Sequence, residues 1–373
     1  MKLVILKDKL EEALRGCEII SPKKTTLLIL QNVLLVSEKN FLKLSATNLE
    51  SGVIFWVLAK IEKEGKICVP AKTFSQTIEY FPSKPLNLSV ENNSLLVECE
   101  NLQVFVDGVS SEEFPIIPEI KSEEAIFLDG KTLCVNLSSL IKIPSPSTAR
   151  PELSGVLFSF QEKTLKLVAT DSFRLAERKI NLSQEVTKKI NLILPQNSVR
   201  ELIQIFEKEE ELRLYLSPSQ VWFETFSLET NHPKIHYTTR LIEGEYPEYE
   251  EIIPKEFNTQ ATFLKEEFLN QLRIAGIFSG KTNEVRLKIL PKENKILISS
   301  QSPNLGRYQG GVRAKITGKE IEIAFNWKFL QEGIVESGKS EIELSLTNSD
   351  GPAIIRGTEE KNYFYCLMPI KIS

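Results

Sequence analysis

The sequence contains very little histidine: His232 and His236 are the only two among 373 residues. Histidine is the side chain that most often moves protons in enzymes near neutral pH. Any histidine-based catalysis would therefore depend on one short segment, in which Pro233 separates the two rings. No glutamate lies between them, as the metalloprotease helix motif requires. The pattern predicts an ordinary polar loop and no catalytic or metal-binding histidine.

Cysteine is also scarce, and it is scattered. The five cysteines never form a C-x-x-C pair, and their odd number does not suit a disulfide framework, so we expect buried free thiols in a reducing compartment. The N-terminus lacks the apolar run of a signal peptide. The longest apolar run, Val53–Ala59, is far shorter than a membrane span, so we expect a cytoplasmic protein. The cysteines are Cys17, Cys68, Cys99, Cys134 and Cys366.

Nucleotide-binding motifs are missing as well. The triplet GKT occurs at Gly130–Thr132 and at Gly280–Thr282, but a P-loop needs another glycine five positions earlier. Those two positions hold Ala125 and Ala275. We therefore expect no nucleotide site, and nothing in the sequence predicts a metal or another cofactor.

The charge balance is slightly acidic, with a formal net charge of −4 and a pI near 5.7. Nucleic-acid-binding domains usually have a basic balance, although a basic surface on an acidic particle remains compatible with this composition. Acidic runs at Glu207–Glu211 and Glu243–Glu251 allow one enzyme hypothesis, in which carboxylates bind a metal ion for hydrolysis. Solvated hairpins explain the same runs more simply, so the residues favour a non-enzymatic scaffold.

What the sequence does contain is one phrase that occurs three times. LKLSATNLE begins at Leu42, LKLVATDSF at Leu165 and ILISSQSPN at Ile296. This spacing is much longer than the ~20–50 residues of a solenoid repeat, so it indicates three copies of one domain. Strand-to-helix junctions and alternating apolar runs follow each copy in the same order. The junctions are Val69–Phe74, Leu194–Val199 and Ala324–Phe329, and the runs are Leu86–Val90, Leu212–Leu216 and Ile342–Leu346.

Each copy is predicted to be an α+β domain with two amphipathic helices and antiparallel sheets. Apolar residues recur at helical spacing near the start and the middle of every copy, first from Lys7 to Cys17. The remaining segments alternate like short strands of ~5–8 residues, and their connections are too short for parallel crossovers. Two similar proline-rich segments suit linkers, which we place near Ser122 and Phe257. The predicted domains are 1–122, 123–257 and 258–373.

All of the predicted helices carry a cation that projects away from the apolar stripe. If the helices gather on one surface, these cations would attract phosphate groups without reading bases. An ordinary solvated face explains the same pattern equally well, because Glu12, Glu79 and Glu332 also point outward. The six cations are Arg15, Lys72, Lys142, Arg200, Arg273 and Lys328.

Taken together, these motifs resemble the bacterial sliding clamp, the β subunit of DNA polymerase III. The resemblance extends from Met1 to Ser373 and rests on LKLSATNLE, VATDSFRLA, EGEYPEYEEIIP and the C-terminal YFYCLMPIKIS. It implies the DNA-clamp fold, in which three similar domains form a six-domain ring as a head-to-tail homodimer. It also implies a non-catalytic processivity factor that encircles double-stranded DNA without sequence preference. The family is commonly classified with the DNA-directed DNA polymerase, a nucleotidyltransferase, that it serves. The implied partners are the replicative polymerase, the clamp loader, and other replication and repair proteins that carry short peptide motifs.

The resemblance further implies a hydrophobic pocket that binds partner peptides between the second and third domains and is completed by the C-terminal tail. Ser172-Phe173 stands where the family usually has Gly-His, which predicts a reshaped pocket. The matching wall residues are Leu153, Thr170, Ser172, Phe173, Arg174, Leu175, Pro247, Ile252, Cys366, Leu367, Met368, Pro369 and Ile370.

For the other two surfaces, the resemblance implies short sets of residues. The positions that match DNA-facing residues are Lys24 and Arg150, with the helix cations as further candidates, although Gln196-Asn197 stands where relatives often carry basic residues. The positions that match the dimer contact are Val104, Val106, Ile277 and Phe278. A triplicated scaffold that binds only proteins is the alternative of a different class, and it predicts neither a ring nor salt-sensitive retention on DNA.

Overall fold

The computed structural model describes residues 1–119, 124–145, 149–227, 230 and 232–371. Within these residues the chain forms two compact units. Unit 1 comprises Met1–Val135, Leu182–Val186 and Leu194–Ile242, and unit 2 comprises Asn136–Asn181, Thr187–Ile193 and Glu243–Ser373. The second sequence repeat is thus divided between the two units. The linker predicted near Ser122 lies outside the described residues, and the predicted domain boundaries stay a prediction.

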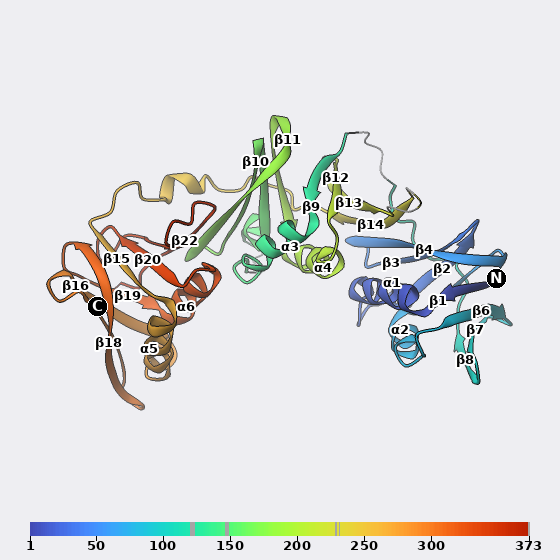
Figure 1. The fold of residues 1–373 in the computed structure, drawn as a ribbon, viewed down its shortest axis with the longest axis horizontal. Helices are drawn as coiled ribbons and strands as arrows, with labels where there is room; N and C mark the ends of the chain where they lie inside the picture. The colour runs from blue at the N-terminus through green and yellow to red at the C-terminus, as the bar shows by residue number, and fades with distance from the viewer. Residues whose placement is uncertain (120–123, 146–148, 228–229, 231, 372–373) are drawn as a thin grey trace. The chain divides into compact units, whose positions relative to one another are not determined.

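Unit 1 is built on a continuous antiparallel sheet with the strand order β8-β7-β6-β1-β4-β14-β13-β12-β9, to which β2, β3 and β5 are attached through β4 (Figure 1). Its strands are β1 (Lys2–Leu6), β2 (Asn32–Glu38), β3 (Phe41–Thr47), β4 (Ser51–Lys63), β5 (Gly65–Pro70), β6 (Pro85–Glu91), β7 (Ser94–Cys99), β8 (Leu102–Asp107), β9 (Ile126–Asp129), β12 (Glu211–Leu216), β13 (Gln220–Phe226) and β14 (Pro233–Arg240). Its helices are α1 (Lys7–Ile20), α2 (Ala71–Glu79) and α4 (Gln196–Phe206), and α3 (Gly130–Ser138) begins here and ends in unit 2.

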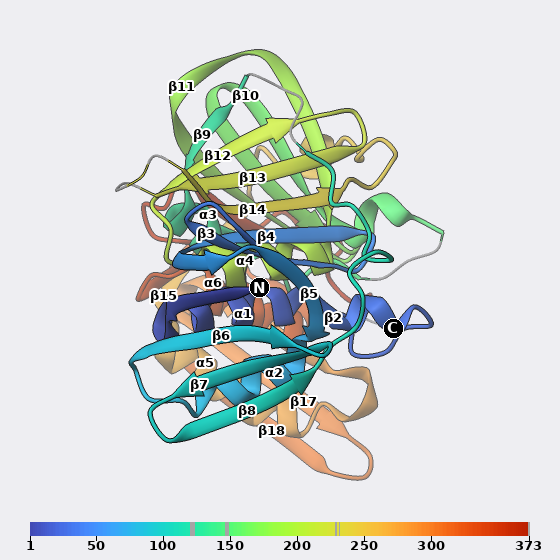
Figure 2. The ribbon, with the colours of Figure 1, turned by 90° about the vertical axis from the view of Figure 1, so that its right-hand side faces the viewer.

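The predicted apolar stripe of the first helix forms its buried face. Leu10, Leu14 and Cys17 of α1 are fully buried, and α1 packs beside α2 and against β3 and β4 (Figure 2). Gly16 allows this close packing, because a Cβ atom there would lie 2.2 Å from the ring of Phe55 on β4. A helix packed on a sheet in this way buries one stripe and leaves its opposite face for solvent.

Unit 2 repeats the construction. Its strand order is β10-β11-β22-β21-β20-β15-β18-β17-β16-β19, and all the strand pairs described are antiparallel. Helices α5 and α6 pack against each other, as α1 and α2 do in unit 1. The elements are β10 (Gly155–Thr170), β11 (Arg174–Pro195), β15 (Thr259–Leu264), α5 (Lys265–Ile277), β16 (Glu284–Leu290), β17 (Lys295–Ser302), β18 (Gly306–Gly318), β19 (Ile321–Asn326), α6 (Trp327–Glu336), β20 (Glu341–Leu346), β21 (Ala353–Gly357) and β22 (Tyr363–Leu367).

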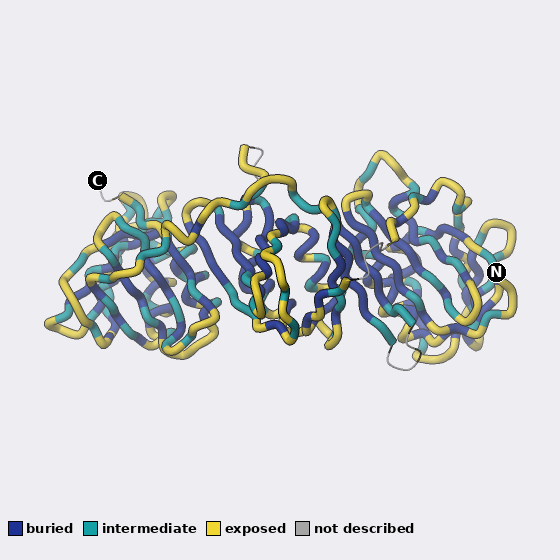
Figure 3. Tube along the Cα trace, turned by 90° about the horizontal axis from the view of Figure 1, so that it is seen from above, coloured by how far each residue is buried: buried dark blue, intermediate teal, exposed yellow. Residues whose placement is uncertain are grey.

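The strand-to-helix junctions lie where the repeats predict them: α2, α4 and α6 each begin directly after a strand. The prediction of uniformly short strands is wrong. β10 has 16 residues and β11 has 22. Burial follows the pattern of the strands, whose interiors are dark blue in Figure 3, whereas the exposed residues gather in the connections. No helix in the described residues is long and apolar enough to cross a membrane.

Three smaller predictions can be checked directly. All five cysteines are free and buried, as expected. The polar-loop prediction is wrong for His236, which lies in β14, is 4% exposed, and has its Nδ1 atom 3.8 Å from the Glu224 carboxylate. The hairpin interpretation of the acidic runs is wrong as well. Glu207–Glu210 joins α4 to β12, and Tyr249–Ile252 forms a 3-10 turn in which Glu250 pairs with Lys166.

Candidate partner-binding site

The repeated phrase of the sequence forms a hydrogen-bonded turn between β10 and β11. The Asp171 Oδ1 atom accepts from the backbone N–H groups of Phe173 and Arg174, each at 3.0 Å. The Thr170 hydroxyl accepts from the Ser172 N–H at 3.2 Å and donates to the Arg174 carbonyl at 2.8 Å. Ser172 has a φ of 75°, which is uncommon for a residue other than glycine. The turn holds this conformation and points Phe173 outward, with its side chain 63% exposed.

The same turn occurs in the first repeat, atom for atom. The Asn48 Oδ1 atom accepts from the N–H groups of Glu50 and Ser51, and the Thr47 hydroxyl accepts from the Leu49 N–H. Leu49 has the same φ of 75° as Ser172. Short Thr and Asx side chains that bond the backbone two and three residues ahead are the usual reason for such turns. The recurrence in sequence is therefore a recurrence of local hydrogen bonding.

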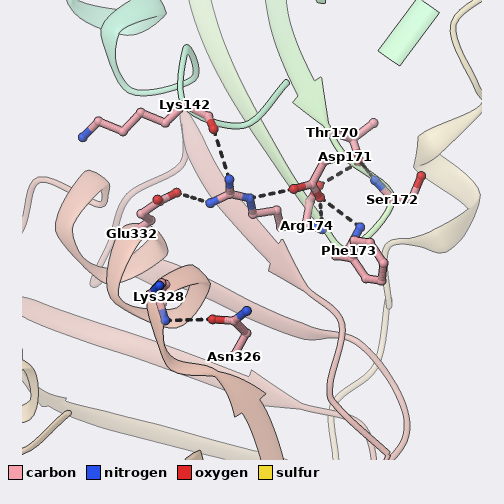
Figure 4. Close-up of polar contacts among 9 residues, drawn as sticks. All are labelled: Lys142, Thr170, Asp171, Ser172, Phe173, Arg174, Asn326, Lys328 and Glu332. Atoms are coloured by element: carbon pink, nitrogen blue, oxygen red, sulfur yellow. Dashed lines mark hydrogen bonds and ion pairs between the residues drawn. The ribbon is translucent and has the colours of Figure 1, made fainter. Parts of the chain in front are cut away.

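Arg174 connects this turn to the rest of unit 2 (Figure 4). Its guanidinium donates to the Asp171 carboxylate at 3.0 Å, to the Lys142 carbonyl at 3.0 Å, and to the Glu332 carboxylate on α6. The guanidinium also lies 4.1 Å above the ring of Phe329. Burial opposes ionisation of Arg174, but its neighbours, chiefly Tyr365, Glu332 and Asp171, raise its pKa overall. The sequence pattern predicted that Glu332 lies on an outward, solvated face. This prediction is wrong, because Glu332 pairs with Arg174.

The C-terminal tail lies along the other side of the turn. β22 pairs with β11, so that Leu367 lies opposite Arg174 and Cys366 opposite Leu175. Beyond β22, the Met368 N–H donates to the Phe173 carbonyl at 2.9 Å, and the Ile370 N–H donates to the Ala324 carbonyl at 2.8 Å. The tail residues Met368–Ile370 are thus fixed next to the turn by backbone hydrogen bonds.

The segment that follows β14 supplies further neighbours. The Tyr246 hydroxyl donates to the Val168 carbonyl at 3.5 Å, and the Tyr249 hydroxyl donates to the buried Glu177 carboxylate at 2.5 Å. Burial and the Glu177 carboxylate both raise the pKa of Tyr249, so Tyr249 stays a neutral donor. These two bonds fix the segment on β10 and β11. Pro247, between the two tyrosines in the sequence, and Ile252, which follows them, remain exposed.

The predicted wall residues fall into two groups according to their exposure. The buried ones form the foundation: Leu153, Thr170, Arg174, Leu175, Cys366 and Leu367 are all less than 9% exposed. The accessible ones are Ser172, Phe173, Pro247, Ile252, Met368, Pro369 and Ile370, of which Pro369 and Ile370 are half-buried. Only the second group can touch a ligand without rearrangement. Burial raises the pKa of the Cys366 thiol to about 12, so it stays protonated and unreactive.

The predicted DNA-facing cations are all exposed. Arg15 forms ion pairs with Glu11 and Glu79, and Lys142 forms one with Glu336. Arg150 directly precedes a 3-10 turn (Pro151–Ser154). Within the described residues, no ion pair involves the side chains of Lys24, Lys72, Arg200, Arg273 or Lys328.

The predicted dimer residues lie in two places, on an edge strand and at the end of a helix. Val104 and Val106 are on β8, the terminal strand of the unit 1 sheet. Ile277 ends α5 and is 66% exposed, and Phe278 stacks on Tyr308 of β18 with ring centroids 6.4 Å apart.

Comparison with known proteins agrees over almost the whole chain. The N-terminal, central and C-terminal domain models of the DNA polymerase III beta subunit match residues 1–118, 143–248 and 250–371. The chain is 28% identical to the beta sliding clamp of Synechococcus elongatus and 26% identical to that of Bacillus subtilis, with all of each chain covered. The crystal structure of the Bacillus subtilis sliding clamp matches with a TM-score of 0.92 at 25% identity, again over all of both chains. A Pseudomonas aeruginosa DNA polymerase III subunit beta has the same fold, with a TM-score of 0.93 at 22% identity over all of both chains.

The chain therefore belongs to the DNA polymerase III beta subunit family, with all three of its domains present. This confirms the predicted clamp fold and the predicted function, a non-catalytic sliding clamp of DNA polymerase III. Sequence reasoning missed Asp171, Phe329 and Glu332 as the residues that hold Arg174. Only Asp171 left a signal, because it occupies the position of Asn48 in the repeated phrase.

Replacing Arg174 with alanine should lower the free energy of unfolding by about 3 kcal/mol, because it leaves the largely buried Asp171 carboxylate and the Lys142 carbonyl without their donor. Urea unfolding followed by circular dichroism measures the change. Lys142→Ala is the matched control, since it keeps the carbonyl that Arg174 binds and removes only an exposed ion pair. Equal unfolding midpoints for the two variants would contradict this role of Arg174.

Proposed function

We propose that two copies of the chain close head to tail into a ring that encircles double-stranded DNA. The observation that carries this proposal is a pair of unfilled strand edges. In the first two repeats, the first half of a long strand pairs with the last strand of the next repeat: β4 with β14, and β11 with β22. The third long strand, β18, has no strand in the described residues on the edge of Gly306–Arg313 opposite β17. The last strand of the first repeat, β8, pairs with β7 and has no second partner strand among the described residues.

A second copy would satisfy both edges, because exposed edges pair readily with another chain. The repeats also supply a register. Tyr237 and Tyr365 occupy the position of Val104 in their strands, and they lie opposite Val53 and Ala176. The position of Val53 corresponds to Tyr308 in β18, because Val53 lies opposite Ala46 and Tyr308 lies opposite the equivalent Ser300. We therefore place Val104 opposite Tyr308 of the second copy, beside Phe278.

The ring gives the exposed cations a common purpose. The ammonium and guanidinium groups that lack an ion pair are available to phosphates, and such contacts are independent of base sequence. The tether would be topological, so the contacts themselves need only be weak. On this ground we assign Lys24, Lys72, Arg200, Arg273 and Lys328 to this surface. Arg150 is assigned by its match to the family motif alone, and Arg15 and Lys142 must first leave their ion pairs.

The surface around Phe173 would bind short peptides of the replicative polymerase, the clamp loader, and other replication and repair proteins in the cytoplasm. Its accessible apolar residues, among them Phe173, Ile252 and Met368, lie on a turn, a linker and a tail that hydrogen bonds hold in place. A peptide that buries one leucine and one aromatic side chain there gains about 3–6 kcal/mol before its ordering costs. Met368 is an adaptable contact that suits more than one partner.

The chain, once loaded by a clamp loader, should stay on nicked circular DNA and leave linear DNA from its ends. Gel filtration of the loaded complexes before and after linearisation measures the retained protein, at a salt concentration that suppresses simple charge attraction. Retention on the circle alone supports a ring. Equal loss from both DNAs supports the alternative, a triplicated scaffold that binds only proteins.

Cysteines placed at Val104 and Tyr308 should form a disulfide between two copies on oxidation. The corresponding Val53–Tyr237 pair lies between backbone hydrogen bonds, where opposed Cα atoms are ~4.5 Å apart, within the range that a disulfide spans. A non-reducing gel detects the linked dimer. Val104→Cys with Gln309→Cys is the control, because residue 309 points to the other face of the sheet. Linkage by the control pair alone would contradict the register.

The double variant Ile277→Asp with Phe278→Asp should be monomeric. A dimer that survives in this variant at micromolar concentration would show that the interface lies elsewhere.

Deletion of Met368–Ser373 should abolish binding of a polymerase-derived peptide and leave the dimer intact, and Phe173→Ala should weaken binding about tenfold through lost apolar contact. Isothermal titration calorimetry measures the affinity, and sedimentation velocity the dimer. Tyr80→Ala, which removes an aromatic side chain that is 85% exposed in unit 1, is the control. Unchanged peptide affinity after the deletion would refute the assignment of this surface.

A further inference from the structure

Among the residues that the structure describes, no strand fills one gap along the edge of β4 in unit 1. On this edge β14 pairs with β4 as far as Phe55, and β1 pairs with it from Ala59 onward. Neither strand pairs with the residues between, Trp56–Leu58. The Ala59 N–H donates to Asn40 on the β3 side, and backbone groups alternate between the two edges of a strand. Trp56 and Leu58 therefore direct their backbone groups toward the gap.

A cavity of about 740 Å³ lies at this gap. This volume is within the range of small-ligand sites, which are mostly apolar with a few polar groups. The ring of His232 stacks on Phe41 at 4.1 Å and lies edge-on to Trp56 at 5.8 Å. The two leucines of the lining, Leu6 and Leu58, are each 57% exposed. Other leucines of the unit, such as Leu10 and Leu14, are buried. The apolar lining includes Val4, Leu6, Phe41, Trp56, Leu58 and Phe226.

The charged residues of the cavity leave a surplus of positive charge. Lys234 lies between Glu209, at 2.5 Å, and Glu12, at 3.5 Å, so both carboxylates already have a cation. Lys9 and Lys60 also line the cavity. In the part of the chain that the structure describes, neither of these two ammonium groups forms an ion pair, which leaves them available to an anionic ligand.

We infer that this cavity binds a short apolar peptide in extended form that ends in a free carboxylate. The unpaired edge at Trp56–Leu58 would accept the peptide backbone as an added strand segment, which is a common mode of peptide recognition. The apolar lining would receive its side chains, and Lys9 or Lys60 would pair with its terminal carboxylate. This site lies in unit 1 and is separate from the surface around Phe173 in unit 2, so it stands or falls independently of the proposed peptide binding there.

A library of peptides with five randomised C-terminal residues and free carboxyl ends, selected on the immobilised full-length chain, tests the inference. Apolar sequences should be enriched, and they should quench the fluorescence of Trp56 in titrations. The Trp56→Phe variant identifies the quenched signal as that of Trp56. The selected peptides should bind Leu6→Asp at least tenfold more weakly than the wild type. Their C-terminal amides should also bind the wild type several-fold more weakly, and Lys9→Gln with Lys60→Gln should remove that difference.

The matched control is Leu264→Asp. Leu264 ends β15 directly before α5 as Leu6 ends β1 directly before α1, is 53% exposed, and lies in unit 2. Peptides that lose affinity for Leu6→Asp and keep it for Leu264→Asp support the site. Failure to enrich apolar peptides, equal binding to both variants, or equal affinity of acids and amides would each overturn the inference. Binding of octanoate as tight as that of the peptides would replace the peptide with a simple amphipathic anion.

Discussion

The structure depends on one interaction that is made repeatedly: the first half of a long strand pairs with the last strand of the following repeat. β4 and β14 form this ladder in unit 1, and β11 and β22 form it in unit 2. In both places the ladder begins immediately after the same Thr-Asx turn. The hydrogen bond next to the turn is also the same in both: the Arg240 N–H donates to the Glu50 carbonyl at 3.0 Å, and the Met368 N–H donates to the Phe173 carbonyl at 2.9 Å. The turn sets where the long strand starts, and the ladder then fixes which residues of the next repeat lie beside it.

The two turns differ in what they present. In the first repeat the exposed position after the left-handed residue is Glu50, followed by the small Ser51. In the second repeat the same positions hold Phe173 and Arg174, and Arg174 joins Asp171, Glu332 and the Lys142 carbonyl in one network. The same turn conformation thus exposes a charged side chain, Glu50, in the first copy and an aromatic side chain, Phe173, in the second. We place the proposed peptide-binding surface at the second copy because the tail Met368–Ile370 lies there beside the exposed Phe173.

Local patterns were sufficient to predict the helices and the strand-to-helix junctions, because each depends on residues within a few positions of one another. The pairing partners were not predictable in the same way. Arg174 and Glu332 are far apart in the chain, and nothing near Glu332 in the sequence distinguishes it from Glu12 and Glu79, which are exposed. His236 was assigned to a loop because Pro233 precedes it, whereas Pro233 only begins a strand whose position is set by β4 and β13. The wall residues were found through the family motif, but their division into a buried foundation and an accessible surface required the fold.

If the edges of β8 and β18 pair between copies as we propose, the chain is a bifunctional monomer, with one site of each kind for binding its own copies. Such a monomer has an equilibrium between closed rings and open linear chains, since a heterologous contact closes only if the angle between successive copies permits it. A low protein concentration favours the ring, because ring closure is intramolecular. A high protein concentration favours the linear filament. A substitution that changes only the angle between successive copies would leave each edge contact intact. It would nevertheless shift material from rings that can hold DNA to filaments that cannot.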